Sequence, residues 1–411
     1  MNNCSKAEKG GESKGPLAGI QVLDFTHVIS GPYSTQILAD LGASVIKVEG
    51  VEKGDVGRDM APAKNGMSHY FATFNRNKRS IAVDLKSAQG QVVARQLVER
   101  ADVIVENFAP GVIDKLGLGY EAAKTINPAV VYCSISGFGQ IGPLAHKRSL
   151  DLVAQAYAGI MSTNGTADAP PLKVGVPIGD TSASLFAVIG IVSALFERRT
   201  TGLGRYLDIA MYDSLLALLG NHGGYFHFTG TQAQRAGSGH YFSVPYGTFD
   251  AADKPIVIAV MTDASWIGLC AALGVPALGH DPRYATVGAR AENRDALHRE
   301  ICPLIRAQAS QDLLEKLEAH NVPHAPVNTV GDALQHAHTE ARNMVLRLEH
   351  AQYGPVSVTS LPLNGVMRSA HAAPPLRGEH TSDVLLELGH SQADIDALVR
   401  QSAVGTLVSS Q

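Results

Sequence analysis

The acidic residue Asp180 stands where a polar turn meets a long apolar stretch, in VGVPIGDTSASLFAVIG from Val174 to Gly190. Apolar residues recur at helical spacing after it, which predicts a helix from about Thr181 to Arg199. Unpaired N–H groups in the first helical turn stabilise a carboxylate, and also charge that develops on an oxygen bonded to it. Gly179 leaves the neighbouring backbone open to another molecule. The pattern suits a carboxylate nucleophile and equally suits an ordinary N-cap.

Strands that alternate with helices must position this carboxylate. The predicted strands are Ile20–Phe25, Ser44–Glu49, Ser80–Asp84, Asp102–Glu106 and Val130–Ile135, and the predicted helices between them are Pro32–Leu41 and Gly90–Arg100. This alternation predicts an α/β fold with a doubly wound, mostly parallel sheet. Ligands bind such sheets beyond the carboxyl ends of the strands. Those ends are Thr26-His27-Val28, the region after Glu49, Asp84-Leu85-Lys86 and Glu106-Asn107-Phe108.

Two motifs near these strands are typical of nucleotide or phosphate sites. GFGQIG contains Gly137, Gly139 and Gly142, but Pro143 and a polar stretch follow it where a dinucleotide site needs a helix, so it does not indicate NAD. FNRNKRS gathers three positive charges within a few residues, which suits a solvated loop or a phosphate grip.

Length, charge and apolar content exclude several classes of protein for this chain. The chain has 411 residues, 45% hydrophobic and 18% charged, enough for a large core and two or more domains. A net charge of -4 disfavours a general nucleic-acid binder. Residues 1–15 are polar and glycine-rich, which predicts a disordered start without a secretory signal. No uninterrupted apolar run approaches membrane-spanning length, so we expect a protein of the cytoplasm that has no membrane partner.

The four cysteines and sixteen histidines indicate no metal site or disulfide framework, because they are scattered along the chain. The cysteines read as reduced thiols, in keeping with a cytoplasmic protein. They are Cys4, Cys133, Cys270 and Cys302.

Several longer stretches, in their order along the chain, resemble the class III (CaiB/BaiF-type) CoA-transferase family. They are LDFTHVISGP, LGASVIKVE, FNRNKRSIAVDLK, DVIVENFAPGVIDKLGLGY, GD at 179–180, PHAPVNTV at 323–330 and PLRGEHT at 375–381. The resemblance runs from about Leu17 to Leu398. It implies a homodimer of two interlocked, ring-like subunits. Each would have a Rossmann-like, CoA-binding large domain of residues 16–228 and 323–411, and a smaller α+β domain of residues 229–322.

The resemblance also implies roles for single residues. Asp180 falls on the nucleophilic aspartate of the family. The implied CoA contacts are His27, Ile29, Ser30, Val83, Asp84, Leu85, Lys86, Asn107, Phe108, Ala109, Lys115 and Arg148. The implied acyl-site loop is Gly237, Ser238 and Gly239. Each of these also has a structural reading, as a strand-end, core or surface residue.

Three features depart from the patterns of related proteins. GSGHYFSVPYG matches the longer glycine runs of formyl-CoA transferases poorly, and Gly50 stands where many members carry an arginine that meets the nucleotide. The α-methylacyl-CoA racemases resemble the family too, but use a histidine directly before the residue matching Asp151. This chain has Leu150 there, and a leucine carries no proton. His146 lies four residues earlier and would serve only through a shifted loop.

The implied activity moves CoA from an acyl-CoA donor, with succinyl-CoA expected, to a short carboxylic acid through an aspartyl anhydride and an aspartyl-CoA thioester. A CoA thioester is then a co-substrate, and no prosthetic group is expected. The stretches look closest to members acting on dicarboxylic acids, whose second carboxylate would meet Arg235, His240 or Tyr246, with His222 and His227 equally available. Formate, oxalate and carnitine-type acceptors stay open. So do a racemase-like isomerase and a non-catalytic CoA-binding protein.

Overall fold

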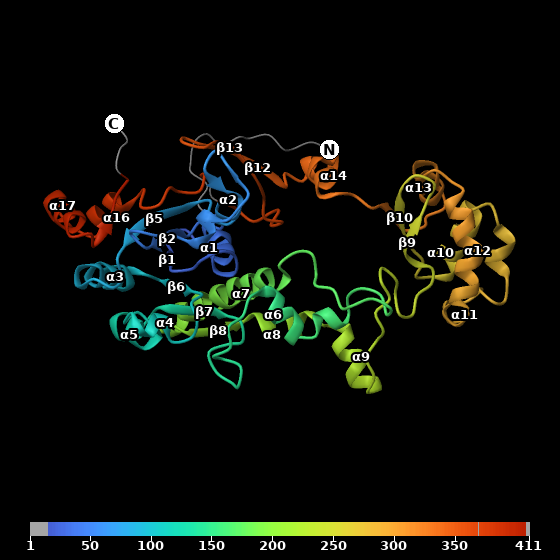
Figure 1. Cartoon of the computed structure of the whole chain (residues 1–411), viewed down its shortest axis with the longest axis horizontal. Helices are drawn as coiled ribbons and strands as arrows, with labels where there is room; N and C mark the ends of the chain where they lie inside the picture. Colours follow the sequence, from blue (N-terminus) through green and yellow to red (C-terminus); the bar gives the residue numbers. More distant parts are fainter. Residues whose placement is uncertain (1–14, 369, 408–411) are drawn as a thin grey trace. The chain divides into compact units, whose positions relative to one another are not determined.

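The computed structural model describes residues 15–368 and 370–407, which form two compact units (Figure 1). Unit 1 comprises Met1–Ala158, Gly175–Leu218 and Glu340–Gln411, and unit 2 comprises Gly159–Val174 and Leu219–Thr339. The expected disordered start falls largely on residues 1–14, outside the described residues. A compact unit need not fold by itself, so the domain boundaries expected from the sequence stay a prediction.

Unit 1 is built on a seven-stranded sheet. Its strands, in spatial order, are β14 (Val404–Gly405), β5 (Lys78–Val83), β2 (Ser44–Glu49), β1 (Gln21–Asp24), β6 (Val103–Glu106), β7 (Val131–Ser136) and β8 (Tyr206–Ala210). All neighbouring strands pair in parallel except β14, which pairs antiparallel with β5. The predicted mostly parallel α/β sheet is therefore confirmed. Because strand order reverses between β1 and β6, their carboxyl ends form the switch point where doubly wound sheets bind ligands.

Apolar periodicity explains why the helices of unit 1 lie on this sheet. In α3 (Ala88–Arg100), buried residues recur at 90, 93, 94, 97 and 98, and the Ser87 hydroxyl caps the first turn by accepting the N–H of Gly90. The other helices of unit 1 are α1 (Ser30–Asp40), α2 (His69–Phe74), α4 (Val112–Lys115), α5 (Tyr120–Ile126), α6 (Asp151–Tyr157), α7 (Ile178–Thr201), α8 (Met211–Leu218), α16 (Thr381–Glu387) and α17 (Gln392–Arg400). Short pieces are β3 (Ala63–Lys64), β4 (Met67–Ser68) and the 3₁₀ turn η1 (Val56–Asp59).

Two groups of helices contact the sheet. Residues of α3, α5, α16 and α17 share a buried core with the strands. In Figure 1 the red C-terminal helices lie beside the blue strand β5, so the end of the chain returns to its first half. The helices α1 and α7 contact each other and also contact strands, and Ser184 Oγ of α7 donates to the Ser30 carbonyl of α1 at 2.6 Å. The start of α7 is thereby tied to the turn after β1.

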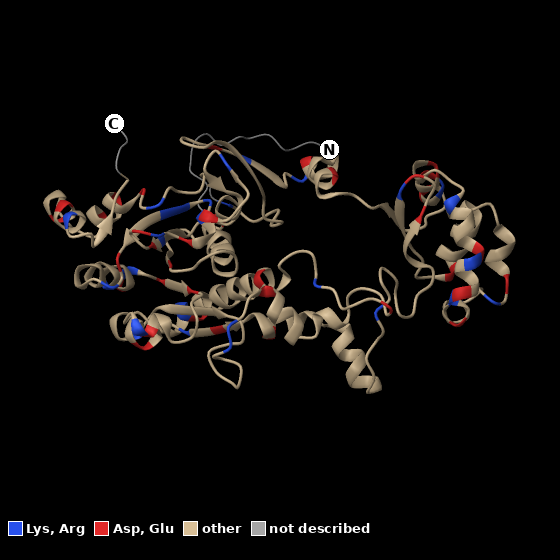
Figure 2. Ribbon diagram, viewed as in Figure 1, with Lys and Arg blue, Asp and Glu red and all other residues tan. Residues whose placement is uncertain are grey.

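The helix α7 begins and ends outside the predicted span of Thr181–Arg199. It ends where Gly202, with φ of +69°, forms a left-handed C-cap. No charged residue lies between Asp180 and Glu197, and Figure 2 draws this part of the helix in tan. By length and composition alone α7 is apolar enough to cross a membrane, as a core helix of a soluble protein can be. The expectation that no apolar run approaches membrane-spanning length is therefore wrong for this helix.

Unit 2 is a smaller α+β unit with its own core. Its antiparallel sheet has the order β11 (His324–Pro326), β10 (Pro255–Ala259), β9 (Tyr246–Asp250). Trp266 lies fully buried at the centre of a core formed by this sheet and the helices packed on it. Its helices are α9 (Asn221–Thr229), α10 (Asp263–Ala272), α11 (Val287–Glu292), α12 (Arg294–Arg306), α13 (Ser310–Ala319) and α14 (Val330–Gln335), with the 3₁₀ turns η2 (Ile160–Ser162) and η3 (Pro276–His280).

The chain then passes through α15 (Ala337–Ala341) into the part of unit 1 that precedes its C-terminal helices. There an antiparallel pair forms between β12 (Val345–His350) and β13 (Gly354–Thr359). Contacts of β13 with α2 attach this pair to the first half of the chain.

Candidate active site

Asp180 lies inside the first turn of α7 and does not precede the helix. The N-cap is Pro177, which makes no side-chain cap, and the helix starts at Ile178. The interpretation of Asp180 as an ordinary N-cap is therefore wrong. The first-turn amide beside it is already used, because the Gly179 N–H donates to Asp151 Oδ1 at 2.7 Å. A Cβ on Gly179 would lie 2.9 Å from that same oxygen, so the contact needs a glycine.

The surroundings of Asp180 disfavour its charged form. The side chain is half-buried, and it forms no ion pair among the described residues. Burial, together with the nearby Asp151 carboxylate, raises the pKa of Asp180 to about 7, and a hydrogen bond with Ser30 opposes this shift. A carboxylate held at such a pKa is poorly stabilised when ionised, which is typical of a reactive group.

The switch point brings several predicted residues to Asp180. The Asn107 side chain, after β6, accepts the His27 N–H at 2.8 Å and donates to the His27 carbonyl at 2.9 Å. It also donates to Ser30 Oγ at 3.3 Å, and Ser30 in turn hydrogen-bonds Asp180. The residues His27, Ser30, Asn107 and Asp180 therefore form one connected group, although they come from three separate segments of the chain.

The other predicted contacts lie in the same unit with fewer polar links. Ile29 is the N-cap residue of α1, and Phe108 meets the His27 ring edge-on at 5.5 Å between ring centres. After β5, Val83 is buried, and Asp84 Oδ1 accepts the N–H of Lys86 at 3.0 Å while Leu85 packs against the core. The exposed side chains of this set are Lys86, Ala109, Lys115 and Arg148. Their CoA contacts stay a prediction.

The predicted acyl-site loop belongs to unit 2. Ser238 Oγ accepts the Thr248 N–H at 2.9 Å, which ties the loop to β9, and Gly237 takes a φ of +62°. Ser238 and Gly239 line a pocket of about 840 Å³ within unit 2, together with Arg235, His240, Tyr241, Tyr246 and Arg294. The role of this loop toward an acyl group stays a prediction.

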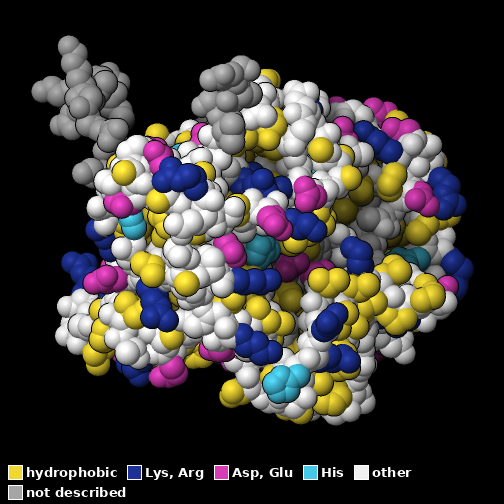
Figure 3. All heavy atoms as spheres, turned by 60° about the vertical axis from the view of Figure 1, so that its left-hand side comes forward, with side chains coloured by type: hydrophobic (Ala, Val, Ile, Leu, Met, Phe, Trp, Pro, Cys, Tyr) yellow, Lys and Arg dark blue, Asp and Glu magenta, His cyan; other side chains and the backbone are white. Residues whose placement is uncertain are grey.

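Two of the three cations of FNRNKRS are buried in ion pairs and so belong neither to a solvated loop nor to a phosphate grip, whereas Arg79 is partly exposed and pairs with Glu387 at 2.6 Å. Arg76 is 1% exposed and pairs with Asp40 at 2.6 Å. The Lys78 ammonium is buried and lies 2.9 Å from Asp24. Both cations form buried ion pairs inside unit 1. The sequence pattern was misleading because it does not show which carboxylates lie near them. Other Lys and Arg side chains are numerous around the middle of the face drawn in Figure 3, with acidic side chains among them.

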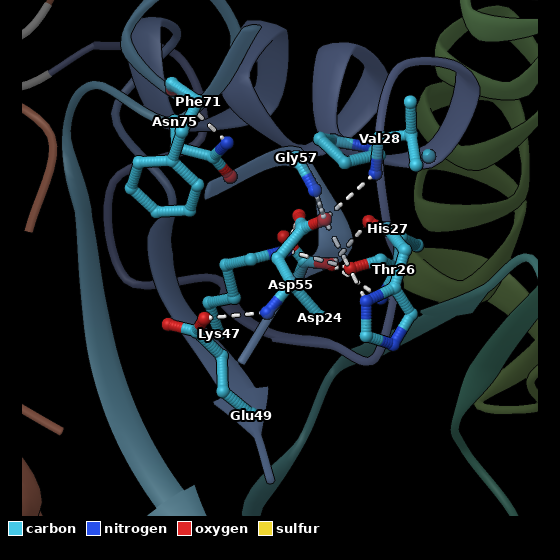
Figure 4. Close-up of polar contacts among 12 residues, drawn as sticks. Asp24, Thr26, His27, Val28, Lys47, Glu49, Asp55, Gly57, Phe71 and Asn75 are labelled. Atoms are coloured by element: carbon cyan, nitrogen blue, oxygen red, sulfur yellow. Dashed lines mark hydrogen bonds and ion pairs between the residues drawn. The ribbon is translucent and has the colours of Figure 1, made fainter. Parts of the chain in front are cut away.

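Sequence reasoning missed a buried charged cluster beside the switch point (Figure 4). Lys47 of β2 lies 2.9 Å from Asp55 in the following loop and donates to the Thr26 carbonyl at 2.6 Å. Asp55 is 1% exposed and receives the Val28 N–H at 2.9 Å. A lysine between the apolar residues Ile46 and Val48 of a strand was the available signal, since a buried lysine needs a carboxylate partner.

Backbone donors for an oxyanion are partly occupied. The Gly139 N–H donates to Ser136 Oγ and the Gln140 N–H to Asp208 Oδ2, both at 2.9 Å. The Gly179 N–H is taken by Asp151. The amides at Gly139, Gln140 and Gly179 are therefore already used within unit 1. Among residues 15–368 and 370–407, no cluster of three or more His, Cys, Asp or Glu residues suits a metal ion.

Comparison with known proteins gives a consistent result. The family model of CoA-transferase family III matches residues 17–381. An acetyl-CoA:oxalate CoA-transferase from Acetobacter aceti is 40% identical over 81% of this chain and 86% of its own length. A succinyl-CoA:glutarate CoA-transferase from Mus musculus is 34% identical over 94% of this chain and 90% of its own. A CAIB/BAIF family protein from Brucella suis has a solved structure that covers 91% of this chain and all of its own, with 36% identity and a TM-score of 0.84.

The family match spans most of the chain. The two relatives are 40% and 34% identical to this chain over most of its length, which shows common family membership as well as a common fold. Their fold agrees with the mostly parallel sheet of unit 1. This chain therefore belongs to CoA-transferase family III, and it is an enzyme that transfers CoA groups.

Proposed function

We propose that this enzyme moves CoA from succinyl-CoA to a short dicarboxylic acid, with Asp180 as the covalent nucleophile. The observation that carries the proposal is the surroundings of Asp180, a half-buried carboxylate with a pKa raised to about 7 at the start of a helix. Such a carboxylate gains by forming a neutral covalent bond, because its charge is then removed from a poorly solvating site. Asp180 also lies at the positive end of the dipole of α7, which favours negative charge on the oxygens of the intermediates.

The exchange proceeds in balanced steps. The Asp180 carboxylate attacks the thioester carbonyl, the carbon–sulfur bond breaks, and an anhydride and the CoA thiolate form. The thiolate attacks the Asp180 carbonyl and frees succinate, which leaves an aspartyl-CoA thioester. The acceptor carboxylate then attacks this thioester and expels the thiolate, which gives a second anhydride. The thiolate attacks the acceptor carbonyl of this anhydride, takes the acceptor acyl group and restores Asp180. Each intermediate is an anhydride or a thioester and so stays activated, and no ATP is needed.

The released thiolate must stay near the anhydride, so the CoA anchors contribute to the chemical step. We assign the anchor nearest to Asp180 to His27, Ser30 and Asn107, because their hydrogen bonds connect the switch point to the nucleophile. The further contacts are those predicted from the sequence, namely Ile29, the residues from Val83 to Lys86, Phe108, Ala109, Lys115 and Arg148.

The side chains expected from the sequence to meet the second carboxylate of the acid differ in how many free donors they have. Arg235 is less suited to bind it than the sequence indicated, since its guanidinium already donates to the carbonyls of Thr166 and Ala169 at 3.0 and 2.6 Å. His240 is better suited. Its Nδ1 accepts two backbone N–H groups at 3.0 and 3.1 Å, which leaves Nε2–H as a donor. Burial and the nearby Arg294 lower the pKa of His240, so the ring acts as a neutral donor.

We further propose that the enzyme works in the cytoplasm as the interlocked, ring-like homodimer of its family. Large apolar side chains on α7 support a protein partner, since Leu185, Ile189 and Phe196 are 50%, 59% and 74% exposed. A contiguous apolar face of this kind is stable in water only when another surface covers it. Replacement of Phe196 by Glu is expected to convert dimers to monomers in size-exclusion chromatography with light scattering.

Intact-protein mass spectrometry after incubation with succinyl-CoA and hydroxylamine tests the covalent step. Hydroxylamine captures an activated aspartyl group as a stable hydroxamate, so the wild-type chain gains the mass of one hydroxamate. The Asp180→Ala chain gains none. The matched control is Asp213→Ala, because Asp213 also lies in the first turn of a helix but is exposed, and it keeps the adduct.

Absence of the adduct with several acyl-CoA donors contradicts the proposal. Solvent deuterium uptake at the α-carbon then identifies a racemase-like isomerase, and no uptake identifies a non-catalytic CoA-binding protein. The structure gives the racemase no proton carrier at Leu150, which is 76% exposed at the start of α6.

A further inference from the structure

The turn between β1 and α1 contains a residue in a conformation that its side chain disfavours. Val28 has a φ of +68°. This left-handed region crowds the Cβ of any L-residue, and it is a genuine outlier for a β-branched one. Such a conformation persists only where the surroundings impose it, and it gathers at functional sites. The groups that hold Val28 therefore determine where His27 and Ser30 lie on either side of it.

A buried carboxylate from another loop holds this turn. Asp55 Oδ1 accepts the N–H of Val28 at 2.9 Å and that of Gly57 at 2.8 Å, as Figure 4 shows. The Asp55 N–H donates to Glu49 Oε2 at 2.9 Å, and Lys47 Nζ lies 2.9 Å from Asp55 Oδ2. Burial alone would raise the pKa of Asp55, but Lys47 and His27 outweigh it and hold that pKa far below its usual range. Asp55 is thus a fixed anion.

The same carboxylate faces the ring of His27. Nδ1 of His27 is buried without a hydrogen-bond partner and lies 3.6 Å from Asp55 Oδ1. An anion beside Nδ1 favours a proton on that nitrogen, which leaves Nε2 as the nitrogen available to a ligand. On the other side of the turn, the His27 N–H is held by Asn107. The two consecutive amides of His27 and Val28 are therefore fixed by two side chains, one directly after β6 and one in the loop after β2.

We propose that Asp55 is a positioning residue of the acyl-CoA site, which holds the His27-Val28 turn in its strained conformation and sets the orientation of the His27 ring. The proposal rests on the CoA contacts proposed above. Its effect reaches the nucleophile through the turn, because Asn107 links His27 to Ser30, and Ser30 hydrogen-bonds Asp180. Asp55 itself touches neither the reacting atoms nor Asp180.

The test compares two buried carboxylates that each pair with a buried cation. Asp55→Asn keeps the shape of the side chain but removes its charge, so the hydrogen bonds from the Val28 and Gly57 N–H groups lose their charged acceptor and weaken. The buried charge of Lys47 still has Asp24 and Glu49 nearby. Asp40→Asn does the same to the Asp40–Arg76 pair, and Asp40 is at the opposite end of α1 from the His27 turn. We expect both variants to melt at lower temperature. Only Asp55→Asn should weaken CoA binding, by about tenfold or more in isothermal titration calorimetry.

A second substitution separates positioning from a general loss of stability. Glycine adopts a φ of +68° without strain. Val28→Gly therefore removes the strain against which Asp55 holds the turn. In the Asp55→Asn chain, Val28→Gly is expected to recover a large part of the lost CoA affinity. If Asp55→Asn does not fold, Val28→Pro serves in its place, because proline lacks the N–H and cannot take a positive φ. It leaves the buried charges intact and should weaken CoA binding likewise.

Three results would overturn the proposal. A folded Asp55→Asn or Val28→Pro chain that binds CoA as tightly as the wild type would refute the positioning role of Asp55 and leave the proposed CoA site intact. A double variant that binds no more tightly than Asp55→Asn would show that strain at Val28 is irrelevant. A wild-type chain without affinity for CoA would remove the proposed site and this inference together. Because the titration uses CoA alone, its result does not depend on whether Asp180 is the nucleophile.

Discussion

Asp55 and Asp180 are two carboxylates of unit 1 with opposite surroundings. Asp55 receives two backbone N–H groups and pairs with the buried ammonium of Lys47. Asp180 receives a hydrogen bond from Ser30 and has the Asp151 carboxylate as its charged neighbour. The pKa of Asp55 is accordingly held far below its usual range, whereas that of Asp180 is raised to about 7.

The difference separates a carboxylate that holds structure from one that can react. Donors and a cation stabilise the ionised form of Asp55, so it gains nothing by forming a bond. The ionised form of Asp180 has few such partners, so its lone pairs are available to an electrophile. Pairs of titratable groups with pKa values driven apart are typical of enzyme sites in which each group has its own task.

The largest expected effect is on activity, and it tests the reactive member of the pair. Asp180→Asn should lower kcat of CoA transfer by at least about 10⁴-fold, as removal of a covalent nucleophile does in other enzymes. The amide keeps the size and the hydrogen bond of the side chain but cannot form the anhydride. Asp213→Asn is the control in the same steady-state assay, and it should keep wild-type kcat. A residual rate near that of the wild type would show that the carboxylate is dispensable.

The next largest effect is on stability, and it tests Asp55, the carboxylate that holds structure. Lys47→Met should lower the free energy of unfolding by about 3–5 kcal/mol, because it leaves the buried carboxylate of Asp55 without its paired cation. Urea denaturation followed by circular dichroism measures this loss. Arg205→Met breaks an ion pair with Glu197 in which both side chains are about half exposed, and it should change stability far less. Equal losses in the two variants would mean that the buried cluster is not special.

A smaller effect on stability is expected with the opposite sign at Asp180. Its folded pKa of about 7 lies above the unfolded value of 3.8, so the folded state binds the proton more tightly. Stability should therefore fall as pH rises from about 4 to about 7. Asp180→Asn removes this loss and should stabilise the protein at pH 8 by roughly 1–3 kcal/mol, with little change at pH 4. Equal stabilisation at both pH values would exclude an ionised Asp180 as the cause.

The smallest expected effect concerns the pH dependence of transfer. Attack requires ionised Asp180, so kcat/KM should rise with pH through about 7. Asp151→Asn removes the neighbouring charge, while its Oδ1 can still accept the Gly179 N–H, so the rise should move to lower pH. Asp213→Asn is again the matched control and should leave the profile in place. A profile unmoved by Asp151→Asn would assign the shift at Asp180 to burial alone.

Much of the fold could be predicted because its signals are local. Alternating strands and helices gave the mostly parallel sheet, and the strand Ser44–Glu49 was predicted with its observed bounds. Helix starts were less accurate. Pro32–Leu41 begins at Ser30 in the structure, and Thr181–Arg199 begins at Ile178. Turn residues such as Gly31 and Gly179 hide the first helical turn, because glycine carries no helical signal of its own.

The candidate site was predictable only in part, since it depends on which residues meet. The sequence indicated that His27, Asn107 and Asp180 matter, and their contacts place them in one group. It did not indicate that Arg76 and Lys78 pair with buried carboxylates, or that Asp55 accepts the N–H of Val28. Pairing between segments far apart in the chain leaves no periodic pattern, so a charged cluster in sequence does not reveal its partners.

The most direct test of the central claim follows an oxygen atom from the acceptor acid into Asp180. When an acid with both carboxylate oxygens labelled as ¹⁸O attacks the aspartyl-CoA thioester, one labelled oxygen bridges the anhydride and stays on Asp180 after the thiolate takes the acyl group. Peptide mass spectrometry after turnover with succinyl-CoA and ¹⁸O-labelled glutarate should therefore find the label on the peptide that contains Asp180. Formation of glutaryl-CoA without ¹⁸O in the protein would contradict the covalent role of Asp180.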